Sequence, residues 1–128
     1  MGSDSDSGKK KIAIVDDEPG ICFAFSRMIT YLGYPDPAVF SNGTSFVNAI
    51  AKDRQSFDLV LMDYRMPEMN GIEAAKIIQR YRPNTKIILV TGIDTVEEEA
   101  ESEGLKYLRK PVPMGVLAAY LEVTLGES

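Results

Sequence analysis

Residues 59–63 have the sequence LVLMD, four apolar side chains followed directly by a carboxylate. Two further stretches share this arrangement: IAIVDD at residues 12–17, and IILVT at residues 87–91, where a hydroxyl takes the place of the carboxylate. A short run that is apolar on both faces is typical of a strand in a parallel sheet, because helices cover such a sheet on both sides. These three stretches therefore predict the central strands of an α/β fold.

Helical patterns follow each of these strands, and two weaker strands complete the series. The weaker strands are expected at residues 38–40 and 107–108. The helices are expected at 19–32, at 44–50, at 70–82, at 95–103 and at 117–125, the last being amphipathic. The alternation of strand and helix, five times over, predicts an open, doubly wound parallel sheet with right-handed crossovers.

The length and composition indicate a single domain. The chain has 128 residues, of which 45% are hydrophobic, enough for one core and too few residues for two. Residues 1–8 are small and polar, and they are expected to be a disordered leader or a cloning remnant before a domain at 9–128. No apolar run approaches the length of a membrane span, so a cytoplasmic location is expected by default.

The charged and sulfur-containing residues exclude several classes of function. The net charge is −5, from 14 basic and 19 acidic residues, which disfavours broad binding to nucleic acid. A single cysteine cannot form an internal disulfide bond. Without histidine, a structural zinc site and Ser-His or Cys-His catalysis are also excluded.

Polar side chains follow four of the expected strands, at the ends where ligands bind in open parallel sheets. They are Asp16 and Asp17, Asp63, Thr91 and Lys110. Three clustered carboxylates repel one another unless a cation joins them. With oxygen ligands only, that cation is expected to be Mg²⁺ or Mn²⁺, which binds carboxylates together with a substrate phosphate. The nearby ammonium and hydroxyl suit phosphoryl oxygens, so the pattern predicts phosphoryl transfer to a carboxylate.

Four motifs at these positions resemble the receiver domain of two-component response regulators. They are IVDDE at 14–18, LVLMDYRMPEMNG at 59–71, ILVTG at 88–92 and YLRKP at 107–111. The resemblance extends from about Lys10 to Leu125 and implies a flavodoxin-like fold of three layers with strand order 2-1-3-4-5. It also implies that Asp63 accepts a phosphoryl group from a phosphohistidine on a sensor histidine kinase or a histidine phosphotransfer protein.

The same resemblance implies a set of metal ligands. Asp17, Asp63 and the backbone carbonyl of Arg65 are expected to bind Mg²⁺ directly, and Asp16 mainly through water. Arg65 and Ile93 flank the acceptor at positions that, in the family, influence how long the acyl phosphate survives.

A switch is implied as well. Thr91 and Lys110 are expected to contact the phosphoryl oxygens, and Tyr107 corresponds to the aromatic residue that turns inward as the threonine moves. The surface formed by the fourth helix, the fifth strand and the C-terminal helix is expected to change as a result. The Lys110–Pro111 bond is expected to be cis.

A phosphorylation-controlled signalling domain, rather than a classical enzyme, is the function that these expectations describe. Its partners would be the phosphodonor protein and a downstream effector protein or domain, without direct binding to nucleic acid or membrane. The alternative is a pseudo-receiver that serves as an interaction module without phosphorylation. An aspartyl phosphatase is excluded because Arg65 stands where that chemistry needs an acid. The oligomeric state stays open, and the artificial-looking leader favours a receiver taken from a longer protein over a stand-alone regulator.

Overall fold

The computed structural model describes residues 10–92 and 96–126, so the expected leader at 1–8 and Ile93 lie outside the described residues. Within them, five strands alternate with five helices: β1 (Ile12–Val15), α2 (Pro19–Tyr31), β2 (Ala38–Phe40), α3 (Gly43–Ala51), β3 (Leu59–Asp63), α4 (Gly71–Tyr81), β4 (Lys86–Thr91), α5 (Val96–Ser102), β5 (Lys106–Arg109) and α6 (Met114–Leu125). Every strand and helix expected from the sequence is present, with boundaries that differ by a few residues.

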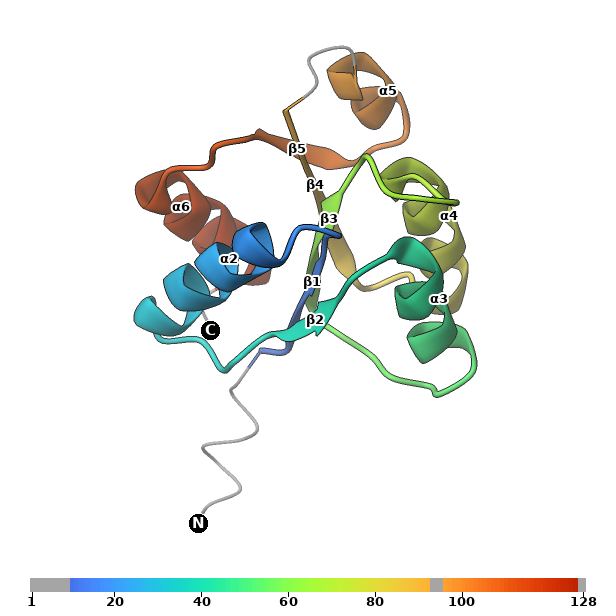
Figure 1. Ribbon diagram of the computed structural model, residues 1–128, viewed down its shortest axis with the longest axis horizontal. Helices are drawn as coiled ribbons and strands as arrows, with labels where there is room; N and C mark the ends of the chain where they lie inside the picture. The colour runs from blue at the N-terminus through green and yellow to red at the C-terminus, as the bar shows by residue number, and fades with distance from the viewer. Residues whose placement is uncertain (1–9, 93–95, 127–128) are drawn as a thin grey trace.

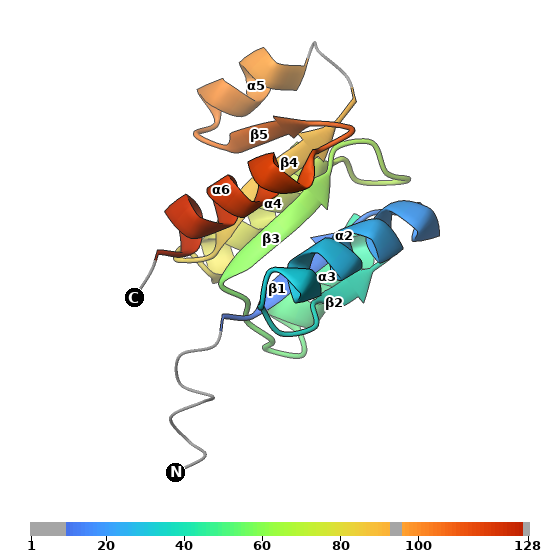
Figure 2. The ribbon, with the colours of Figure 1, turned by 90° about the vertical axis from the view of Figure 1, so that its left-hand side faces the viewer.

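The strands form one parallel sheet in the order β2-β1-β3-β4-β5. Figure 1 shows the sheet edge-on, and Figure 2 shows it turned by 90°, with α2 and α6 in front of it. All four pairings are parallel, and the residues of β1 and β3 are buried throughout. β2 and β5 lie at the edges, where exposed residues interrupt the apolar pattern. The flavodoxin-like fold and the strand order are thus confirmed.

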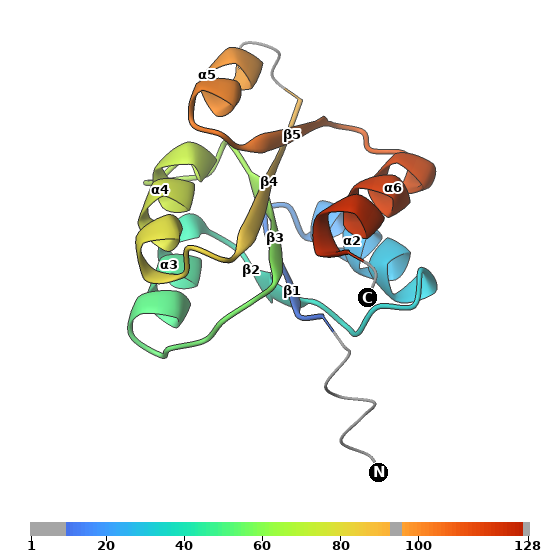
Figure 3. The same ribbon diagram turned by 180° about the vertical axis from the view of Figure 1, so that it is seen from behind.

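Helices cover both faces of the sheet, which gives three layers (Figures 1 and 3). On one face, α2 and α6 bury Phe25, Ile29, Leu117 and Leu121 against the sheet. On the other face, α3, α4 and α5 bury a second cluster: Phe46, Ile50, Ile72, Ala75, Ile78, Val96 and Ala100. Burial on both faces explains why the central strands are apolar at every position.

Local sequence signals fix the helix that follows β3. Asn70 caps α4 by accepting a hydrogen bond from the backbone N–H of Glu73, and the Glu73 carboxylate accepts one from the N–H of Asn70. This reciprocal capping box satisfies two backbone donors that the helix itself leaves unpaired. The backbone N–H of Gly71 also donates to the carbonyl oxygen of Tyr64 at 2.8 Å, which holds the start of α4 beside the end of β3.

The prediction that the C-terminal helix is amphipathic is wrong. Leu117 and Leu121 are buried in α6 as expected, but Val116 and Val123 are 40% and 77% exposed, and Glu122 is the one charged residue of the helix. Helical spacing identified the buried face correctly, yet the opposite face is apolar too. The exposed valines do not make α6 a membrane span, since none of the helices in the described residues has the length and apolar composition to cross a bilayer.

Candidate functional site

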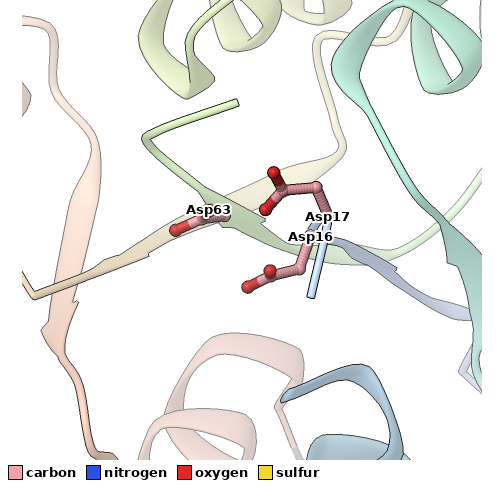
Figure 4. A group of neighbouring side chains, drawn as sticks. All are labelled: Asp16, Asp17 and Asp63. Atoms are coloured by element: carbon pink, nitrogen blue, oxygen red, sulfur yellow. The ribbon is translucent and has the colours of Figure 1, made fainter. Parts of the chain in front are cut away.

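The carboxyl ends of β1 and β3 place three aspartates side by side (Figure 4). Asp63 is the last residue of β3, and Asp16 and Asp17 follow β1 directly. The two strands are neighbours, with Val15 paired to Met62, so both segments leave the sheet at the same level. Ligand oxygens of the three aspartates all lie within 4.8 Å of one another. The structure thus brings together the three carboxylates that the sequence singles out.

Lys110, which follows β5, adds an ammonium group to this cluster. Its Nζ donates hydrogen bonds to Oδ2 of Asp16 at 3.0 Å and to Oδ1 of Asp63 at 3.2 Å. Its side chain is only 19% exposed, so solvent screens these contacts weakly. The Lys110–Pro111 bond is cis, as the sequence resemblance implied.

The two aspartates after β1 differ in burial and in partners. Asp16 is buried, and its Oδ1 accepts a hydrogen bond from the backbone N–H of Glu18 at 2.9 Å while its Oδ2 accepts the bond from Lys110. Asp17 is exposed and lines the cavity in front of the cluster. Asp16 therefore holds the lysine in place, whereas the carboxylate of Asp17 is exposed at the cavity.

The electrostatics of the cluster are unbalanced. Burial, followed by the negative charge of Asp16, raises the pKa of Asp63 to about 6, and the nearby ammonium of Lys110 opposes this rise only in part. Burial also lowers the pKa of Lys110, but its hydrogen bonds and attraction to Asp16 and Asp63 outweigh that effect and raise the pKa overall. Negative charge at this edge of the sheet therefore exceeds what one lysine compensates.

A cavity of about 720 Å³ opens onto the cluster. Asp63 lies at its buried end, because only 7% of its side chain is exposed. Thr91, the last residue of β4, lines the same cavity and is buried, and the exposed Arg65, two residues after Asp63, lines it too. A small group that enters the cavity meets a carboxylate, a hydroxyl and an ammonium together.

Thr91 and Tyr107 share one face of the sheet. Tyr107 pairs with Leu89 in the parallel register of β4 and β5, and Leu89 lies two residues before Thr91. Alternate residues of a strand point to the same side, so Thr91, Leu89 and Tyr107 belong to the face that α3, α4 and α5 cover. Tyr107 is half-buried there, packed against the apolar cluster of that face.

Sequence reasoning missed two residues that shape the site. Glu18 lies with its Oε1 3.8 Å from Nζ of Lys110, and a third acid after Asp16 and Asp17 was the available signal. Gly71 packs so closely beneath Asp63 that a Cβ there would overlap the carbonyl oxygen of Asp63 and lie 2.9 Å from Cδ2 of Leu89. Only a glycine fits between these groups, and the sequence pattern alone does not reveal the close approach.

The donor set fits a hard divalent cation. Asp16, Asp17 and Asp63 offer carboxylate oxygens at mutual distances that one ion can span. Hard cations such as Mg²⁺ take oxygen ligands of this kind and bind through one or two carboxylates. The raised pKa of Asp63 shows that its charge is under-compensated, which a second positive charge would correct.

Comparisons with known proteins agree on one family. The family model described as the response regulator receiver domain matches residues 12–122. The transcriptional regulatory protein ZraR of Klebsiella oxytoca is 36% identical over 121 residues, which cover 91% of this chain and 26% of ZraR. The chemotaxis protein CheY of Thermotoga maritima is 35% identical over 119 residues, which cover 90% of this chain and 98% of CheY. The chain thus spans about a quarter of the length of one relative and nearly all of the other.

A solved structure supports the same grouping. The response regulator protein TrrA of Thermotoga maritima, determined in complex with Mg²⁺ and BeF, superposes with a TM-score of 0.81 at 27% sequence identity. The alignment covers 91% of this chain and 99% of TrrA.

Proposed function

This chain belongs to the family of response regulator receiver domains, and on that premise we propose that Asp63 is its phosphoacceptor. The chain is a signalling domain of two-component pathways rather than a classical enzyme. One observation carries the assignment: Asp63 is the carboxylate at the buried end of the cavity, and its Oδ1 lies 3.2 Å from the ammonium of Lys110.

The metal ligands that we propose are Asp17, Asp63 and the backbone carbonyl of Arg65, with Asp16 acting through water. Asp17 and Asp63 line the cavity together, and both oxygens of Asp16 are already engaged by Glu18 and Lys110. Mg²⁺, or Mn²⁺ as a substitute, would neutralise charge on the transferring phosphoryl group. The complex of TrrA with Mg²⁺ supports this choice of ion.

The transfer itself uses three side chains. A carboxylate oxygen of Asp63 forms a bond to phosphorus while the bond from phosphorus to the imidazole nitrogen of the donor phosphohistidine breaks. Lys110 compensates the negative charge that spreads over the phosphoryl oxygens, and Thr91 offers a hydroxyl donor to one of them. Burial of Asp63 keeps the nucleophile desolvated and fixed in position.

The new phosphoryl group shifts the equilibrium between two conformations of the domain. It adds negative charge and acceptor oxygens at Asp63, and Thr91 moves toward them. Tyr107 lies on the same face of the sheet as Thr91 and turns inward into the space that the threonine leaves. The surface of α5, β5 and α6 is altered, which is the output of the domain.

The partners we propose follow from this chemistry. The phosphodonor is a sensor histidine kinase or a histidine phosphotransfer protein, and the output surface engages a downstream effector protein or domain. We place the domain in the cytoplasm, where such donors expose their phosphohistidine, and assign it no direct contact with nucleic acid or membrane.

Phosphorylation by a small-molecule donor tests the proposal. Acetyl phosphate with Mg²⁺ is expected to add one phosphoryl group to the intact protein, detected by mass spectrometry. Asp63→Ala should abolish the addition, whereas Asp53→Ala, which removes an exposed aspartate outside the cavity, should not.

The alternative of a phosphorylation-independent interaction module makes the opposite prediction. In that case no donor labels the wild-type protein, although the fold and the acidic cluster are intact. The ion pair between Lys110 and Asp63 disfavours this alternative, because it positions a cation where a phosphoryl group would need one.

A further inference from the structure

Glu18 stands at the open side of the cavity and faces the lysine of the site. Its Oε1 lies 3.8 Å from Nζ of Lys110, and its side chain is 65% exposed, whereas Asp63 is buried at the other end. Glu18 occupies the N-cap position of α2, yet its side chain makes no capping hydrogen bond. The carboxylate is therefore not needed to begin the helix, and it is directed to the cavity instead.

Glu18 lines the cavity in which a donor would meet Asp63. In an in-line transfer the leaving group departs on the side opposite the nucleophile. Asp63 attacks from the buried end, so the leaving group lies toward the exposed end, where Glu18 and Asp17 line the cavity. Asp17 is committed to the metal in the proposed function, and among the residues that the structure describes the carboxylate of Glu18 has one ion-pair contact, the long one to Lys110.

We propose that Glu18 selects the phosphodonor, favouring N-phosphoryl donors whose leaving nitrogen carries a proton over acyl phosphates whose leaving group departs as a carboxylate. This inference rests on the proposed role of Asp63 as the acceptor. It concerns a specificity-determining residue at the entrance, not a group that bonds to phosphorus.

The leaving groups of the two donors differ by one unit of charge, both in the bound donor and after departure. With phosphoramidate, the P–N bond breaks and its electron pair returns to a protonated nitrogen, so a cationic group leaves as neutral ammonia. With acetyl phosphate, the P–O bond breaks and its electron pair stays on oxygen, so acetate leaves with a negative charge. In both cases Asp63 forms the new O–P bond. A carboxylate beside the leaving group attracts the first donor and opposes the second.

The ratio of two rate constants tests the proposal. Phosphorylation of the full chain is followed with acetyl phosphate and with phosphoramidate, each at low donor concentration and saturating Mg²⁺. In Glu18→Gln, the rate with acetyl phosphate is expected to rise about three- to tenfold, while the rate with phosphoramidate stays within about twofold or falls. The shift should shrink as salt is added, because screening weakens the charge at the entrance.

Two further variants serve as controls. Glu18→Asp keeps the charge and should retain the wild-type ratio. Asp53→Asn removes an exposed carboxylate that does not line the cavity, with the same change in net charge, and should leave both rates unchanged. A structural effect of the Gln substitution would alter both donors alike, so the ratio isolates the electrostatic role.

The outcomes separate this inference from the proposed function. An equal change for both donors in Glu18→Gln, or no change for either, overturns the role of Glu18 and leaves Asp63 as the acceptor. Labelling that persists in Asp63→Ala overturns the proposed function itself.

Discussion

The two ends of the sheet carry opposite electrostatic arrangements. At the amino end, polar groups are matched within the chain: the backbone N–H of Lys11 donates to Asp58 at 2.7 Å, and the guanidinium of Arg82 donates to the carbonyls of Arg54 at 3.0 Å and Gln55 at 3.2 Å. These contacts close loops against the sheet. They serve stability, and the carboxylate among them, that of Asp58, is exposed to solvent.

At the carboxyl end, negative charge is in excess, and part of it is buried. Asp16 and Asp63 are buried beside a single lysine, and Asp17 and Glu18 add two more negative charges at the cavity. An excess of buried negative charge costs stability unless a cation binds. The difference indicates that one end of the sheet is organised for the fold and the other for a ligand, at the expense of the free protein's stability.

The largest expected effect comes from the packing of Gly71 beneath Asp63. Gly71→Ala places a Cβ against the backbone of Asp63 and against the side chain of Leu89. Both neighbours are packed in the core, so neither can move away without a shift of the surrounding structure. We expect a loss of about 3 kcal/mol in the free energy of unfolding, measured by urea denaturation. Gly92→Ala is the matched control at the same end, since nothing lies within 4 Å of a Cβ there, and an equal loss in both would contradict this explanation.

The pH dependence of stability tests whether the buried carboxylate of Asp63 destabilises the folded state. Folding raises the pKa of Asp63 from 3.8 to about 6, so the folded state prefers the protonated carboxyl. This preference stabilises the folded state in full below pH about 4, and the stabilisation is lost as the pH rises through about 6. The free energy of unfolding changes by about 3 kcal/mol over this range. In metal-free protein, Asp63→Asn should therefore become more stable than wild type by up to this amount at pH 8 and should match it near pH 4.

Mg²⁺ provides the control for this experiment. Added to the wild type at pH 8, it should reduce the stability difference between wild type and Asp63→Asn, because the cation compensates the charged carboxylate. A difference that is the same at pH 4 and pH 8 would show that burial does not perturb Asp63.

The affinity for Mg²⁺ is expected to depend on carboxylates at the carboxyl end of the sheet and not on those at the amino end. Asp17→Asn is expected to weaken Mg²⁺ binding at least tenfold, as measured by isothermal titration calorimetry, because it removes a charged ligand from the cavity. Asp58→Asn removes a carboxylate at the amino end and should leave the affinity unchanged. Unaltered binding in Asp17→Asn would remove this residue from the metal site.

The smallest effect is expected at the amino end. Arg82→Ala removes hydrogen bonds to two backbone carbonyls and should cost about 1 kcal/mol of stability. The rate of phosphorylation should stay at the wild-type value, measured with acetyl phosphate under saturating Mg²⁺. A slower reaction in a folded Arg82→Ala protein would indicate that the two ends are coupled.

Much of the fold could be predicted from the sequence, because it depends on local patterns. Continuous apolar runs predicted the buried strands, and the Asn70 cap predicted the start of α4. Since strand ends in a parallel sheet meet at one edge, the sequence also predicted that Asp16, Asp63 and Lys110 converge. That prediction needed topology but no side-chain detail.

Three features could not be predicted from the sequence, each for a physical reason. The outer face of α6 is apolar, so helical spacing could not show that Val116 and Val123 are exposed. The contact between Glu18 and Lys110 depends on side-chain directions across two loops. Asp16 and Asp17 differ in burial: Asp16 is the partner of Lys110, and Asp17 is exposed. Two adjacent residues of the same type give no sequence signal for this difference.

The most direct test of the account is to locate the phosphoryl group. The protein is phosphorylated with acetyl phosphate, the acyl phosphate is trapped by reduction, and the modified peptide is identified by mass spectrometry. We expect a single modification, at Asp63, that forms only when a divalent cation is present. Modification of Asp16, Asp17 or a residue outside the cavity, or modification of Asp63 in the absence of any divalent cation, would contradict the account.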